Sequence, residues 1–266
     1  MHGPECLILG AARGYGLAQL RPFLVSLRAT GYRGRLCLLM STDADPATVT
    51  ALERARVIVE PFDLPTRPAV EVNTARYLKY LEVLLAHPCE QVFLTDTRDV
   101  IFQADPFALD LTTSTCFFME PDTVTLGTCA TNSHWLRAAF GKAMAARIGD
   151  RPISCSGTTL GTRRGILDYL KAMIGAMAEA DPAALTVTGI DQAIHNMLIQ
   201  DGRLSDFSLS ANGRHVLTMG HLPRESVTLR PDGIVANADG TMPAVVHQYN
   251  YPRHEDICRA VLDKYR

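Results

Sequence analysis

The first 105 residues alternate between short apolar segments and longer amphipathic ones, and no other feature constrains the fold as strongly. A short apolar run predicts a buried strand, and a longer segment with helical periodicity predicts a helix. Strands that alternate with helices are typical of a parallel sheet covered by helices on both faces. We expect strands at 6–10, 35–40, 55–59 and 91–95, and helices at 17–30, 45–54 and 74–86. The last helix is amphipathic, and its buried face is expected to carry Tyr77, Leu78, Leu81, Leu84 and Leu85.

The remainder of the chain is less regular, and it contains no internal repeat and no obvious linker. A strand is expected at 116–119, with short strand-like pieces after residue 201. Helices are expected at 132–148, 163–180 and 189–200. The sequence therefore predicts one α/β domain over residues 1–266, with a nucleotide-binding half at about 1–105 and a substrate-binding half at about 106–266.

Composition excludes several classes of protein. Lysine and arginine number 26 against 28 acidic residues, a net charge of −2, so the main electrostatic reason to expect nucleic-acid binding is absent. No apolar run reaches the roughly 18 residues of a transmembrane helix. The N-terminus leads straight into the apolar Cys6–Leu9 without a signal-peptide pattern. None of the seven cysteines has C-x-x-C spacing, which favours free thiols and a cytoplasmic protein.

A glycine-rich loop follows the first predicted strand. The segment Gly10-Ala11-Ala12-Arg13-Gly14-Tyr15-Gly16 is a variant of dinucleotide-binding loops, so one interpretation is an NAD(P)-dependent oxidoreductase of the short-chain type. Two features count against it: no tyrosine stands four residues before a lysine, and residues 32–39 contain no acidic residue. The loop then either forms a turn that requires glycine, or it contacts a different nucleotide through Gly10, Ala11 and Arg13.

The most informative segment runs from Val92 to Phe107. Its apolar strand leads directly into Asp96 and Asp99, with Asp105 further on. Ligands of open parallel sheets bind beyond the carboxyl ends of the strands, and paired carboxylates there can hold Mg²⁺ or Mn²⁺. The alternative is that both aspartates cap the next turn while Arg98 neutralises one of them.

These motifs together resemble bacterial glycosyltransferases of the GT-A fold, a group distantly similar to glycogenin. The resemblance rests on Arg76-Tyr77-x-x-Tyr80, on the F-L-T-D-x-R-D-V-x-F-Q-x-D-P-F pattern of residues 93–107, and on three later segments, 153–161, 189–196 and 246–250. It covers about residues 6–255. Most such enzymes carry D-x-D, whereas two residues separate Asp96 from Asp99, so which aspartate binds the metal directly stays open.

The resemblance implies roles for individual residues. Asp96, Asp99 and His247 would hold the metal, and Asp191 and Gln192 would act on donor-sugar or acceptor hydroxyls. Arg76 could pair with a motif carboxylate or with the diphosphate, and Tyr80 lies one helical turn away from it. The remaining donor contacts would come from Thr97, Arg98, Ser156, Gly157 and Thr158.

Ordinary structural roles remain open for several of these residues. Arg76 could be a surface arginine, residues 156–158 a plain turn, Asp191 a partner of the helix dipole, and His247 a buried structural histidine. His134 and His195 lie within helical patterns and are expected to be structural.

The resemblance implies a GT-A domain that transfers a sugar from a nucleotide diphosphate sugar, with uridine favoured. The acceptor would be a hydroxyl of a glycan, a lipid-linked molecule or a protein, as in bacterial polysaccharide synthesis. If the transfer inverts the anomeric centre, Asp191 is the first candidate base; if it retains it, the leaving phosphate can take the proton. Two more interpretations stay open: a phosphotransferase with Asp96 as nucleophile, and a non-catalytic nucleotide-sugar-binding protein.

Overall fold

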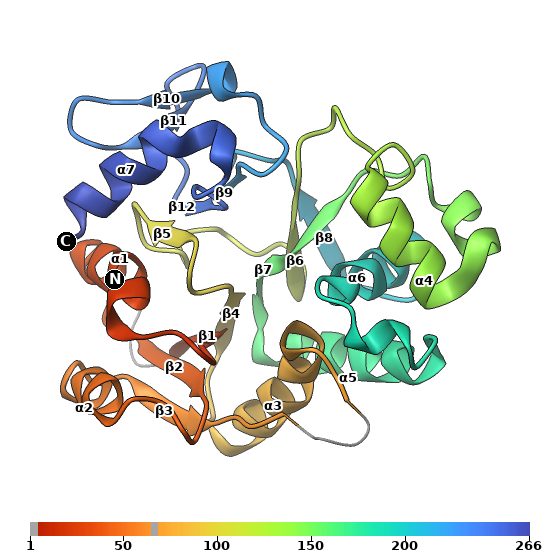
Figure 1. Ribbon diagram of the computed structural model, residues 1–266, viewed down its shortest axis with the longest axis horizontal. Helices are drawn as coiled ribbons and strands as arrows, with labels where there is room; N and C mark the ends of the chain where they lie inside the picture. The colour runs from red at the N-terminus through yellow and green to blue at the C-terminus, as the bar shows by residue number, and fades with distance from the viewer. Residues whose placement is uncertain (1–4, 65–68) are drawn as a thin grey trace.

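The computed structural model describes residues 5–64 and 69–266, and it is an α/β protein built on a mostly parallel sheet of seven strands (Figure 1). The strand order is β3-β2-β1-β4-β7-β6-β8. Only β7 runs antiparallel to its neighbours. The strands are β1 (Cys6–Ala11), β2 (Arg35–Met40), β3 (Ile58–Pro61), β4 (Gln91–Thr95), β6 (Thr115–Met119), β7 (Ser154–Thr162) and β8 (Phe207–Ser210). The predicted fold class is confirmed.

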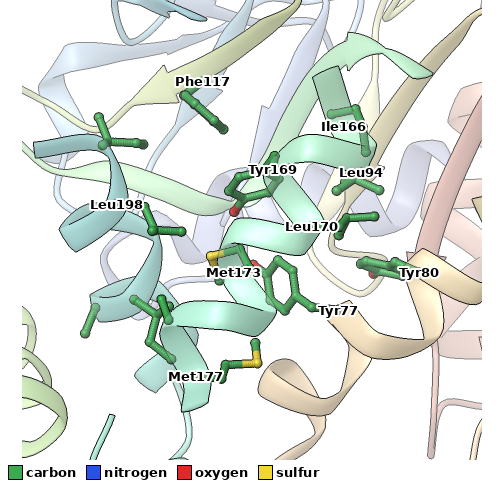
Figure 2. Close-up of a cluster of buried hydrophobic side chains, with 14 of the residues drawn as sticks. Tyr77, Tyr80, Leu94, Phe117, Ile166, Tyr169, Leu170, Met173, Met177 and Leu198 are labelled. Carbon is green, nitrogen blue, oxygen red and sulfur yellow. The ribbon is translucent and has the colours of Figure 1, made fainter. Parts of the chain in front are cut away.

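Helices cover both faces of this sheet. They are α1 (Leu17–Ala29), α2 (Pro46–Arg54), α3 (Val72–Ala86), α4 (Ala130–Arg147), α5 (Arg163–Glu179) and α6 (Ile190–Gln200). Helix α7 (Glu255–Lys264) packs instead against the smaller strands described below. Side chains of one strand point alternately to opposite faces. Accordingly Leu7 and Leu9 pack in one cluster with α3, α5 and α6, whereas Ile8 packs in a second cluster with α1. The first cluster contains Tyr77, Phe117 and Tyr169 (Figure 2).

A smaller layer lies beside the main sheet. Strands β5 (Val100–Phe102), β12 (Val245–His247) and β9 (Val216–Thr218) form a three-stranded sheet, and β10 (Val227–Leu229) pairs with β11 (Val235–Asn237). Helix α7 packs in one apolar cluster with these strands through Ile257 and Val261. Because β5 immediately follows the main-sheet strand β4, the end of the chain is brought back to the middle of the protein.

One local prediction was wrong, and one of the structural alternatives is excluded. The strand expected at 55–59 begins at Ile58, because the chain leaving α2 first turns through Arg56 in the left-handed region (φ 63°). The amide of Val57 then bonds back to the carbonyl of Leu52. Residues 156–158 are not a turn: they lie inside β7, whose carbonyl at Gly157 accepts from the amide of Asp96.

Two further observations concern the expected environment of the chain. Within residues 5–64 and 69–266, no helix is long and apolar enough to cross a membrane. All seven cysteines are free, as expected. The expectation that no signal peptide is present rests largely on residues 1–4, which lie outside the described residues.

Candidate metal and nucleotide site

A cleft of about 170 Å³ opens where β1 and β4 end, and we call it the Asp96 cleft. Asp96 and Asp99 follow β4 directly, so the edge of the sheet predicted to bind a ligand is the edge that carries the cleft. Nine residues line it: Ala11, Tyr15, Asn73, Arg76, Asp96, Thr97, Arg98, Asp99 and Asn250.

Three possible metal ligands come together beside this cleft. One ligand atom from each of Asp96, Asp99 and His247 can be chosen so that all three lie within 4.8 Å of one another. Nε2 of His247 is 3.3 Å from Oδ2 of Asp96 and 3.8 Å from Oδ1 of Asp99. Pairing between β12 and β5 creates this proximity, because it sets His247 opposite Val100, the residue after Asp99.

The surroundings of His247 fit a cation. Its side chain is 1% exposed, and Nε2 is buried without a hydrogen-bond partner among the described residues. A buried polar atom without a partner is costly, so such an atom facing two carboxylates is what a metal site requires. Gly157 forms the adjoining wall: a Cβ there would lie 2.5 Å from Oδ2 of Asp96 and 2.5 Å from Cε1 of His247. Glycine therefore keeps the space between the ligands open.

Burial and charge act differently on the two aspartates. Burial alone would raise the pKa of Asp96, but Arg76 and His247 outweigh it and hold that pKa well below its ordinary value. For Asp99, burial is the largest effect, and with the nearby charge of Asp96 it raises the pKa despite His247. Asp96 is thus ionised in the folded protein, and a cation would favour ionisation of Asp99 as well.

Arg76 joins the two acidic parts of the site. It is 5% exposed on α3; its Nη1 donates to Oδ1 of Asp96 at 2.5 Å and its Nη2 to Oδ2 of Asp191 at 3.0 Å. The expected pairing of Arg76 with a motif carboxylate is confirmed, and a surface role is excluded. Leu78 and Leu85, expected on the buried face of this helix, are 47% and 63% exposed. The buried face of α3 is instead the one that carries Arg76.

Asp191 lies in the first turn of α6, which begins after Gly189 in the left-handed conformation (φ 85°). The carboxylate is 2% exposed, and its Oδ2 also accepts from Oγ of Ser156 at 3.1 Å. Burial raises the pKa of Asp191, while Arg76 opposes that shift. Its position in the first turn also suits the helix dipole, but its bonds place it in the same network as Asp96.

Gln192 points away from the Asp96 cleft, into a buried polar group. Its Nε2 donates to Glu120 and to Asn132, each at 3.1 Å, and its Oε1 accepts from the amide of Ser156 at 3.4 Å. Gln192 therefore links β7 to the end of β6.

The other predicted donor-binding residues divide into two groups. Thr97 donates to the carbonyl of Ala11 at 2.8 Å and packs against Gly10, and Arg98 is exposed at the cleft. Tyr80 and Thr158 are instead fully buried, and their hydroxyls have no partner among the described residues.

Arg13 lies near the ends of β2 and β3, outside the cleft lining. The pKa of Asp63 is lowered mainly by hydrogen bonds from Thr42, and Arg13 contributes to that shift.

The sequence reasoning missed Glu120. Its side chain follows β6 and is buried, and its pKa is raised to about 7 by burial. Nε2 of His221 lies 3.4 Å from Oε2 of Glu120. The available signal was the same as for Asp96: an apolar strand, Cys116–Met119, that leads into a carboxylate.

Three polar lining residues of the cleft were missed as well: Tyr15, Asn73 and Asn250. No sequence pattern identifies these residues as part of the site, because they are brought to the cleft only by the tertiary fold.

Comparison with known proteins adds no relative: neither a known family nor a curated protein matches the chain. Support for a function therefore comes from the cleft itself.

Proposed function

We propose that the chain is a glycosyltransferase that depends on a divalent cation, Mn²⁺ or Mg²⁺, and transfers a sugar from a nucleotide diphosphate sugar to a hydroxyl acceptor. A uridine nucleotide is the favoured donor. The observation that carries the proposal is the Asp96–Asp99–His247 group beside a cleft at the carboxyl edge of a parallel sheet. Diphosphates at such sites are bridged by a cation held on carboxylate oxygens.

Charge balance supports the presence of a cation. Asp96, Asp99 and Asp191 together carry three negative charges when ionised, and Arg76 offsets one of them. Burial alone would lower the pKa of His247, but Cys155, Asp96 and Asp99 outweigh it and raise that pKa well above its ordinary value, so without a cation a proton on His247 offsets a second charge. The group then keeps a charge of −1, which would still repel a bare diphosphate. A cation bound through Nε2 would displace this proton, because only the neutral imidazole is a ligand. Bound at this site, a divalent cation would neutralise the leaving diphosphate.

The remaining residues prepare the site for that chemistry. Arg76 fixes the orientation of Asp96 and prevents it from turning away from His247, because one oxygen is bonded to the guanidinium while the other faces the imidazole. Asp191 is held by the other guanidinium nitrogen of Arg76, and it also accepts a hydrogen bond from Ser156. Asn73, Asn250 and Tyr15 offer polar groups along the cleft for a nucleotide or sugar hydroxyl.

Calorimetry with uridine diphosphate, with and without Mn²⁺, tests the binding half of the proposal. Binding should be at least tenfold tighter with Mn²⁺, and equal affinity in the presence of a chelator would contradict the metal assignment. Nicotinamide cofactors are titrated in parallel, since binding of these and not of the uridine nucleotide would favour an oxidoreductase.

Catalysis is tested separately. Hydrolysis of a panel of nucleotide sugars reports turnover even when the acceptor is unknown. Tight metal-dependent binding without turnover of any donor would favour a non-catalytic nucleotide-sugar-binding protein.

A further inference from the structure

Helix α1 presents an outward face without acidic residues. Its exposed positions include Leu17, Ala18, Arg21, Val25 and Arg28, and the whole helix contains no aspartate or glutamate. Leu17 and Val25 are large apolar side chains that stay exposed on this face, at 39% and 37%. Helix faces that combine apolar residues with arginine are typical of helices that lie at a membrane surface.

A groove of about 640 Å³ continues this face. It lies between the C-terminal half of α1, the start of β2 and the segment that joins α2 to β3; Figure 1 shows α1 and α2 together on one side of the protein. Four exposed arginines line it, Arg28, Arg33, Arg54 and Arg56, together with apolar side chains such as Val25, and its lining contains no acidic residue.

Within the described residues, the guanidinium groups of Arg28, Arg33, Arg54 and Arg56 have no hydrogen-bond or ion-pair partner. Elsewhere on the described surface, some arginines such as Arg147 are paired with carboxylates, and others such as Arg137 and Arg214 are not. Favourable interaction with a helix dipole accounts for Arg28 and Arg54, each in the last turn of a helix. It does not account for the other two.

Arg56 in particular adopts the left-handed backbone region (φ 63°), where glycine is favoured.

Residues 17–57 contain six arginines and three acidic residues, a net +3, in a chain whose total is −2. The positive charge is therefore concentrated on this part of the surface.

We propose that the outer face of α1 and the adjoining arginine groove dock on an anionic phospholipid bilayer. The arginines would bind lipid phosphates, and Leu17 and Val25 would enter the interface between headgroups and acyl chains. Exposed apolar side chains beside the arginines favour a bilayer over a free soluble phosphate, which would leave them in water. The arginine groove lies at the amino end of β2, away from the Asp96 cleft, whereas Leu17 begins α1 two residues after the cleft-lining Tyr15. A test on the groove arginines is therefore independent of the proposed transferase function.

Co-sedimentation with large unilamellar vesicles tests this inference on the intact chain. We expect binding to phosphatidylcholine vesicles that contain 30% phosphatidylglycerol, and none to pure phosphatidylcholine. Binding should weaken at least tenfold in 0.5 M NaCl, because salt screens charges at a surface. Equal binding to neutral and anionic vesicles, or no binding to either, would overturn the proposal.

Two variants locate the surface. Replacing all four groove arginines with glutamine should weaken binding several hundred-fold, since each basic residue near an anionic surface contributes roughly fivefold. A control with the same change of charge replaces four exposed arginines outside the groove, Arg137, Arg164, Arg214 and Arg259, and should lose far less. The double variant Leu17→Ser, Val25→Ser should weaken binding several-fold while keeping its dependence on salt.

Circular dichroism confirms that each variant is folded. Binding of inorganic tripolyphosphate in the groove without vesicle binding would assign a soluble ligand and refute the bilayer. If the groove variant and the control lose affinity equally, the surface has been placed wrongly.

Discussion

Replacing Glu120 with glutamine should remove a penalty on folding that grows with pH. Glu120 is 4% exposed, and burial raises its pKa from 4.5 to about 7. Glutamine has nearly the same shape, and its amide oxygen can still accept from Nε2 of Gln192, which lies 3.1 Å from Oε1 of Glu120. The substitution therefore removes the charge and leaves the packing in place.

The sign follows from proton linkage. Well below pH 4.5 Glu120 is protonated in both the folded and the unfolded chain, so it imposes no penalty. As the pH rises towards 7, the unfolded carboxyl ionises first and the folded state becomes less favourable. A pKa difference of about 2.5 corresponds to roughly 3 kcal/mol at high pH, and to roughly 2.5 kcal/mol between pH 5 and pH 8. The Glu120→Gln protein should gain that amount relative to wild type over this range.

Urea unfolding of both proteins at several pH values measures the difference. His221, 3.4 Å from Glu120, also titrates, and burial lowers its pKa, so its own contribution is lost as the pH falls. Repeating the comparison in a His221→Asn background removes that contribution. Free energies of unfolding that differ by a constant amount across the range would refute the reasoning, because the penalty would then not depend on ionisation of Glu120.

Three further predictions concern the metal site. Gly157→Ala should weaken Mn²⁺ binding at least tenfold, because its Cβ would lie 2.5 Å from Oδ2 of Asp96; Gly175→Ala, with no atom within 4 Å of the added Cβ, should leave calorimetric affinity unchanged. Asp99→Ala should abolish Mn²⁺ binding and turnover but keep the melting temperature, whereas a loss of stability with activity retained would identify a cap. Arg76→Met should cost about 3–5 kcal/mol in urea unfolding, because Asp96 and Asp191 would lose their buried partner; a loss below 1 kcal/mol would contradict that pairing.

The sequence by itself determined the elements of the main sheet. Apolar runs at β1, β2, β4 and β6 and the periodic segments between them predict a parallel α/β sheet, because these patterns depend on local burial alone. The carboxylates of Asp96 and Asp99 are visible in the same way, since they directly follow a buried strand. The local pattern could not show which face of α3 is buried. Leu78 is apolar and was expected in the core but is exposed, whereas Arg76 is buried because it forms ion pairs with Asp96 and Asp191.

Only the tertiary structure decided which distant residues share the site. His247 approaches Asp99 because β12 pairs with β5 in one register, and a shift of one residue would turn its side chain to the opposite face. Strand β7 places Gly157 against Asp96 because it inserts antiparallel between β4 and β6, an order that no local pattern specifies. The sequence supplied the candidate ligands, and long-range strand pairing, which depends on the packing of the whole sheet, decided which of them meet.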